Sequence, residues 1–168
     1  MRIPVQVKVS PVVREWMICC YGSHIIKPHY EDSYGGMIKL LLELQPKEYV
    51  FKKLPEHECI TFLMPHGSFE GNRNYNLYRN YLSPLKQRWL NRLFYYHFKE
   101  IFHFYMVGYL RGGSRTQRAA IEDFCKCYNI PLIHISYEML KKSWDRSEHK
   151  IFFRKHLAHT SPRKYLKR

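Results

Sequence analysis

Apolar and polar residues alternate near the start of the chain and then change to a helical spacing. Residues 5–9, Val-Gln-Val-Lys-Val, have the two-residue period of a half-buried strand. Ser10 and Pro11 follow, a capping residue and a proline at the first helical position. The apolar residues between Val12 and Cys20 then recur at helical spacing up to Gly22. We therefore predict a strand followed directly by a helix that ends at Gly22.

A second helix is predicted after a short extended piece over residues 24–30. Asp32 or Ser33 can cap this helix, and Pro46 ends it. Because its apolar residues lie on all sides, we expect it to be buried; they are Met37, Ile38, Leu40, Leu41, Leu42 and Leu44. Residues 60–64, Ile-Thr-Phe-Leu-Met, predict another strand before Pro65.

The C-terminal part has the pattern of helices. A long helix is expected over residues 83–110, which begin with Ser-Pro and continue without a helix breaker until Gly108. Ser114-Arg-Thr-Gln117 matches a capping box for the next helix, which Asn129-Ile-Pro131 terminates. A third helix is expected from Ser136, with Tyr137, Leu140 and Trp144 on its inner face.

The last two of these helices allow two interpretations. A pair of short helices whose second member carries exposed lysine and arginine is typical of a helix-turn-helix that reads DNA. The connection from Asn129 to Ile135 is longer than the three or four residues usual for that motif. A structural helical hairpin with a solvated outer face explains the apolar pattern equally well.

The charge is unevenly distributed along the chain. The 168 residues carry a formal net charge of +14, with 28 Lys+Arg and 14 Asp+Glu. Residues 1–70 hold eight basic and eight acidic side chains, so the whole excess lies in residues 71–168. Such asymmetry is typical of a module that contacts a polyanion, although a basic surface also serves solubility.

The charge change coincides with a segment rich in glycine and asparagine, residues 66–76. We therefore predict an α+β protein in two parts. A neutral α+β domain, residues 1–70, would precede a linker at 71–76, a helical basic domain at 77–157 and a basic tail at 158–168. The N-terminal domain would mediate self-association or bind a protein partner.

The predicted nucleic-acid-binding residues lie on the two short helices and in the tail. Lysines can neutralise phosphates, and arginine can contact guanine through two hydrogen bonds. The candidates are Arg115, Arg118, Ser136, Tyr137, Lys141, Lys142, Arg146, Arg154, Lys155, Arg163 and Lys164. DNA is favoured over RNA as the partner.

No catalytic residue, metal site or cofactor is predicted. Glu100-x-x-His103 resembles half of a di-iron carboxylate site, but the second copy that such a fold needs is absent from the sequence. Cys125-x-Cys127 with His134 falls short of the paired clusters of structural zinc sites. A nuclease would be the enzymatic alternative, with Glu122, Asp123 and Asp145 as its possible carboxylates.

Cysteine usage and the N-terminus favour a reduced, cytoplasmic environment. The five cysteines are an odd number without disulfide-framework spacing, and the first residues lack the apolar run of a signal peptide. No stretch approaches the roughly 20 apolar residues of a membrane span. We therefore expect no membrane partner.

Two sequence segments resemble a group of short basic proteins encoded by phages and mobile elements of gut bacteria. One is Val7-Lys-Val-Ser-Pro-x-Val13 with Tyr21-Gly22. The other is Ala120-Ile-x-x-Phe124…Tyr128-x-Ile130…Ser136-Tyr-Glu-x-Leu140-Lys-Lys-x-Trp144-x-Arg146. The resemblance implies a bacterial host cell as the setting, with a virion as a second location, and attaches no activity.

These observations together predict a non-enzymatic DNA-binding protein, a regulator or replication accessory of a phage or mobile element. The alternative is a structural or interaction protein, such as a virion component or an inhibitor of a host protein. Its basic surface would then meet an acidic partner or a packaged genome. Salt dependence separates the two, because released counterions weaken DNA binding as salt rises.

Overall fold

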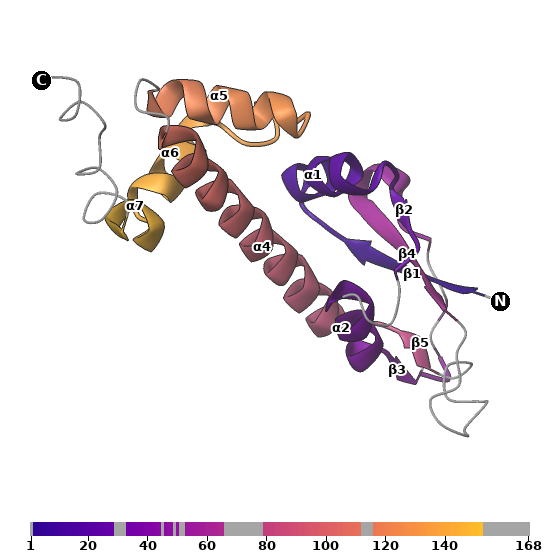
Figure 1. Ribbon diagram of the computed structural model, residues 1–168. Coiled ribbons are helices and arrows are strands. Elements are labelled where there is room, and N and C mark those ends of the chain that lie inside the picture. Colours follow the sequence, from indigo (N-terminus) through magenta and orange to yellow (C-terminus); the bar gives the residue numbers. More distant parts are fainter. Residues whose placement is uncertain are drawn as a thin grey trace, which may run out of the picture. The chain divides into compact units, whose positions relative to one another are not determined.

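The computed structural model describes residues 2–28, 33–44, 46–48, 50, 53–65, 79–111 and 116–152. They form helices and short strands, which confirms a mixed α and β protein (Figure 1). The chain divides into two compact units, unit 1 over Met1–Tyr95 and unit 2 over Tyr96–Arg168. The predicted linker at 71–76 and the tail at 158–168 lie outside the described residues.

Unit 1 is built on a small mixed sheet. Strand β1 (Arg2–Lys8) pairs antiparallel with β4 (Cys59–Pro65), and β2 (Ile25–Ile26) pairs parallel with the other side of β4. The predicted strands at 5–9 and 60–64 are thus confirmed, and they are hydrogen-bonded neighbours. Strands β3 (Glu43–Leu44) and β5 (Arg79–Tyr81) form a separate antiparallel pair that the sequence did not predict.

The first helix of unit 1 has the predicted bounds, but the hydroxyl of the predicted cap, Ser10, makes no capping hydrogen bond. Helix α1 (Pro11–Tyr21) begins with proline and ends at Gly22, which adopts the left-handed conformation with φ of 69°. The Gly22 N–H donates to the carbonyl oxygen of Ile18 at 2.7 Å. The buried face of α1 consists of Val12, Val13, Trp16 and Met17. Figure 1 shows this helix beside the sheet.

The second helix corrects an expectation. Helix α2 (Ser33–Leu41) buries Tyr34, Gly35 and Ile38, but Leu40 is 83% exposed and Leu44 lies beyond the helix in β3. The prediction that this segment is buried on all sides is therefore wrong. The helix ends at Leu41 rather than near Pro46, and of the two predicted apolar residues beyond it Leu42 is buried and Leu44 is exposed.

A long helix closes unit 1 and covers an edge of its sheet. Helix α4 (Pro84–Leu110) confirms the predicted helix over 83–110, and its residues Leu90 and Phe94 are buried. Strand β1 lies at an edge of the sheet, and the side-chain amide of Gln87 forms two hydrogen bonds with the β1 backbone. The amide oxygen of Gln87 accepts from the Lys8 N–H at 3.0 Å, and its amide nitrogen donates to the Gln6 carbonyl at 2.9 Å. One side chain thereby satisfies two groups of an open edge.

Replacing Gln87 with alanine should lower the free energy of unfolding by about 1–3 kcal/mol, because two hydrogen bonds to the β1 backbone are lost. Urea unfolding followed by circular dichroism measures this change. Gln117→Ala is the matched control, since its amide makes a 3.4 Å bond to Asp145 at the exposed surface. Equal destabilisation by both substitutions would contradict the edge-covering role of Gln87.

Unit 2 consists of helices. The second part of α4 packs with α5 (Gln117–Cys127), α6 (Tyr137–Asp145) and the short α7 (Glu148–Phe152). Phe102 of α4 and Phe124 of α5 meet edge to face, with ring centroids 5.0 Å apart. All three of the longer helices contribute to the core, which contains Phe98, Phe102, Met106, Ala120, Ile121, Phe124, Leu140 and Trp144.

The helix starts in unit 2 are set by hydroxyl caps. Thr116, rather than the predicted Ser114, caps α5 by accepting from the Ala119 N–H at 3.2 Å. Ser136 caps α6 by accepting from the Met139 N–H at 3.2 Å, as its position before the apolar run predicts. The pattern identified α5 but placed its start two residues too early.

Candidate nucleic-acid interface

Helix α6 presents apolar and basic residues on different sides. Leu140 and Trp144 are buried, as predicted for the inner face, whereas Tyr137, the third residue predicted there, is half-buried. Lys142 and Arg146 are exposed, and Lys141 is half-buried. An α-helix with its side chains is about 10–12 Å across, which matches the roughly 12 Å width of the DNA major groove. The described structure thus offers a short, solvent-exposed basic helix surface.

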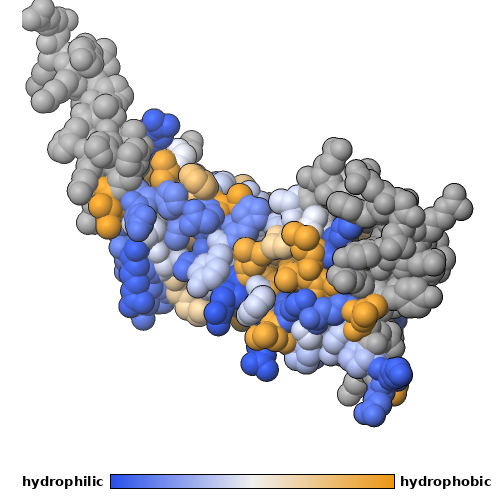
Figure 2. All heavy atoms as spheres, turned by 90° about the horizontal axis from the view of Figure 1, so that it is seen from below, coloured by the Kyte–Doolittle hydropathy of each residue, from blue (hydrophilic) through white to orange (hydrophobic). Residues whose placement is uncertain are grey.

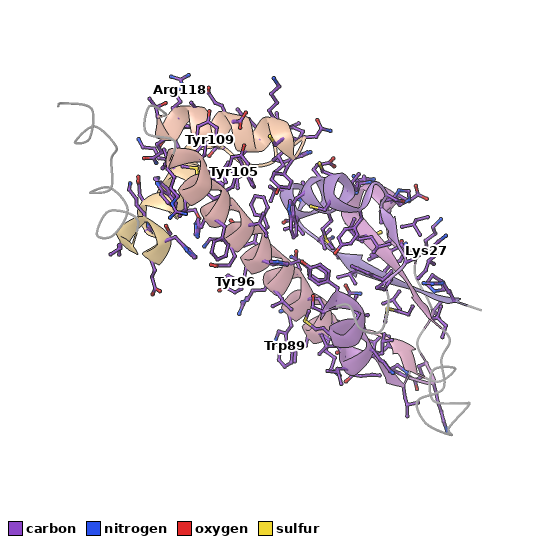
Figure 3. All side chains as sticks on the ribbon, viewed as in Figure 1. Lys27, Trp89, Tyr96, Tyr105, Tyr109 and Arg118 are labelled. Carbon is purple, nitrogen blue, oxygen red and sulfur yellow. The ribbon has the colours of Figure 1, made fainter. Side chains whose placement is uncertain are left out.

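Two basic side chains of unit 2 form ion pairs with carboxylates. Arg118 bonds to Glu122 at 2.8 Å, one turn away on α5, and Lys150 bonds to Asp145. Figure 3 shows Arg118 projecting away from the rest of α5. Among the described residues, no carboxylate lies within 4.0 Å of the Lys142 or Arg146 side chain. These two cations are therefore available to an external anion.

The connection between α5 and α6 departs from a standard helix-turn-helix. It runs from Tyr128 to Ser136, nine residues, and its second residue, Asn129, has a positive φ of 49°. The Ile130 N–H donates back to the Cys125 carbonyl at 2.8 Å, so the turn is closed. The connection is therefore longer than the three- to four-residue turn of that motif.

The remaining predicted residues divide into three groups. The Ser136 hydroxyl is occupied as the α6 cap, so its oxygen is already bonded to protein. Tyr137, also at the start of α6, is half-buried. Five others lie outside the described residues: Arg115, Arg154, Lys155, Arg163 and Lys164. The structure therefore places Lys141 and Lys142 on α6, Arg146 directly after its end and Arg118 on the neighbouring α5.

Comparisons with protein-family models, curated proteins and solved structures found no match. None of the helices in the described part of the chain has both the length and the apolar composition to cross a bilayer. Function must therefore be argued from the residues themselves. Figure 2 shows strongly hydrophilic side chains at several places on the visible face, with apolar residues between them.

The carboxylates considered for a nuclease are held by separate partners. Glu122 pairs with Arg118 and Asp145 with Lys150, while Asp123 accepts a hydrogen bond from the Tyr105 hydroxyl. Figure 3 shows Tyr105 on α4, on the side that faces α5. Burial, and then this hydrogen bond, raise the pKa of Tyr105, so its proton stays on the phenol. These contacts indicate structural ion pairs and hydrogen bonds.

A second group of polar side chains converges between α4 and α7. The Nε2 atom of His149 lies 2.9 Å from the Glu100 Oε2 atom, and the His103 ring lies 5.6 Å from the His149 ring. One ligand atom from each of the three residues lies within 4.8 Å of the other two. The sequence singled out Glu100 and His103, but it gave no sign that His149 would join them.

His103 is buried in this group, and its ring is held in place. Its Nε2 atom lies 3.0 Å from the Ser143 hydroxyl oxygen on α6. Burial, and then the neighbouring His149, lower the pKa of His103 to about 4. The imidazole is consequently neutral at pH 7 and keeps a lone pair on one ring nitrogen.

Unit 1 contains a cavity of about 570 Å³ beside the start of α1. Most polar groups in its wall already serve the fold. Gln87 bonds to the β1 backbone, the Asn91 amide oxygen accepts from the Ser10 N–H, and Lys8 pairs with Glu58 at 2.7 Å. The rest of the described lining is mainly apolar, apart from Arg88 and the buried Ser10 hydroxyl, which has no hydrogen-bond partner among the described residues. One hydroxyl and one cation do not form a convergent set of polar groups.

Proposed function

We propose that this protein binds duplex DNA through unit 2, without catalysing a reaction on it, and that α6 supplies the central contacts. The observation that carries the proposal is the exposed pair Lys142 and Arg146 at one end of α6. Neither has a carboxylate partner among the described residues. A helix with free cations suits a groove lined by phosphates.

The charge of unit 2 supports this proposal. Residues 96–168 contain 15 lysine and arginine side chains and six acidic ones. Four of those carboxylates are already bonded to side chains of the unit, namely Glu100, Glu122, Asp123 and Asp145. The phosphates of a DNA backbone would therefore face a strongly positive electrostatic potential, because few carboxylates of the unit remain free to offset its cations. Long-range attraction of this kind raises both affinity and the rate of association.

The proposed contact differs from that of a helix-turn-helix. In that motif the N-terminal residues of the second helix read the bases. Here the free cations lie toward the C-terminal end of α6, and the Ser136 hydroxyl at its N-terminus is used as a cap. We therefore assign to α6 mainly phosphate contacts, with limited sequence preference. Such binding fits a regulator or replication accessory of a mobile element.

The test is a fluorescence-anisotropy titration of labelled duplex and single-stranded DNA at several salt concentrations. We expect duplex binding whose logarithmic affinity falls with the logarithm of salt concentration, with a slope of about −3 or steeper for three or more phosphate contacts. Preference for the single strand would contradict the assignment of α6 to a duplex groove. Absence of binding at low salt would overturn the nucleic-acid proposal and favour an acidic protein partner.

A further inference from the structure

Three side chains in unit 2 form a ligand set that is typical of metalloproteins. Glu100 and His103 lie one turn apart on α4, and His149 reaches them from α7. Two imidazoles and one carboxylate bind zinc in catalytic sites and iron(II) in non-haem oxygenases. We propose that Glu100, His103 and His149 bind one divalent transition-metal ion, with Zn²⁺ as the first candidate.

The distances support a site that needs only side-chain movement. Ligand atoms about 2.0–2.1 Å from a zinc ion lie about 3.0–3.4 Å from one another. The pair His149 Nε2 and Glu100 Oε2 is already 2.9 Å apart, and all three ligand atoms lie within 4.8 Å of one another. Closing the longest separation takes a shift of roughly 1.5 Å, within the reach of glutamate and histidine rotamers.

The surroundings of the three residues also suit a metal. The Ser143 hydroxyl, 3.0 Å from His103 Nε2, orients the imidazole, as hydrogen bonds from surrounding groups do for metal-ligating histidines. His103 is buried, whereas the side chains of Glu100 and His149 are 53% and 28% exposed. One side of the group is therefore fixed by the core, and the other is open to solvent for metal entry.

A bound ion would connect α7 to α4 beside the proposed DNA-binding helix. His149 lies on α7, and Ser143 lies on α6 between Lys142 and Trp144. Three protein ligands leave at least one coordination position for water or for an external group. The proposed metal site would form whether or not the protein binds DNA.

The experiment uses the full chain, freed of metal with a chelator and kept reduced. Isothermal titration with Zn²⁺ should show one site, and Glu100→Gln and His149→Ala should each weaken it at least tenfold. His57→Ala is the matched control, because this histidine lies in unit 1 and its side chain is 80% exposed. Metal-free circular dichroism and melting curves show whether each variant is folded. If His149→Ala fails to fold, Glu100→Gln alone tests the ligand set.

Co²⁺ provides a readout that a merely structural role of these residues would not change. Bound to the proposed ligands, it should give visible absorption without the thiolate charge-transfer band that cysteine ligation produces. A thiolate band that persists in both variants would overturn the proposal and assign binding to cysteines such as Cys125 and Cys127. Absence of Zn²⁺ and Co²⁺ binding, or unchanged binding in both variants, would equally overturn it.

Discussion

Replacing Lys142 and Arg146 together with alanine is expected to weaken binding to duplex DNA about 10- to 100-fold at moderate salt. Both side chains are exposed and lack carboxylate partners among the described residues. Each cation that contacts a phosphate adds about 0.9 to the magnitude of the salt slope. The double variant should therefore have a slope shallower by about 1.8, measured by the same anisotropy titration.

The matched control removes the same charge elsewhere. Lys47 and Lys53 are exposed residues of unit 1, and Lys53 is only 3.8 Å from Glu56 in a solvent-exposed pair. A Lys47→Ala, Lys53→Ala variant has the same net charge as the α6 variant. We expect it to retain affinity within about threefold. If both double variants weaken binding equally, overall charge rather than the α6 surface accounts for the affinity.

Features set by short stretches of sequence were predicted correctly. Helix α1 lies between a proline start and a left-handed Gly22, and both signals are local. Local signals of this kind also predicted α4, the Ser136 cap and the burial of Leu140 and Trp144 on α6. Strands β1 and β4 were recognised because their alternation reflects one buried face. Local propensity and burial therefore agree in these elements.

Features that depend on distant pairing were missed. β3 and β5 have two and three residues, and each exists only because the other lies beside it. Leu40 was expected to be buried because the α2 segment is apolar on all sides, yet burial depends on which neighbours pack against it. Composition alone cannot supply that information.

The Glu100, His103 and His149 group shows the same limitation. His149 reaches the other two residues because α6 ends at Asp145 and a new helix starts at Glu148, after only two intervening residues. The sequence carried a local signal for α7 alone, because Ser147 is a capping residue and Glu148 an acidic residue of the first turn. In the structure the Ser147 hydroxyl accepts from the Lys150 N–H at 3.2 Å. Recognising that cap predicts α7, but the approach of α7 to α4 requires the packed structure.

The second large effect is expected at Trp144, which holds α6 against the core of unit 2. Trp144 is 1% exposed, and its ring lies 6.2 Å from that of His103. Replacing it with alanine removes a large buried side chain and leaves a cavity, so the free energy of unfolding should fall by about 3–5 kcal/mol. Urea unfolding followed by far-ultraviolet circular dichroism measures the change.

Trp89→Ala is the matched control, because Trp89 is 52% exposed on α4 and Figure 3 shows it pointing away from the helix. Its replacement should change the free energy of unfolding by no more than about 0.5 kcal/mol. Similar losses in the two variants would contradict the burial assigned to Trp144.

The two large effects separate the packing of α6 from its charge. Alanine at Lys142 and Arg146 should reduce DNA affinity while leaving the urea midpoint almost unchanged, since both side chains are exposed. Alanine at Trp144 should lower the midpoint, and it should lower affinity because α6 is no longer held in place. If Trp144→Ala is destabilised but binds DNA normally, the contacts must come from other basic residues of the chain. The function would then not depend on the placement of α6.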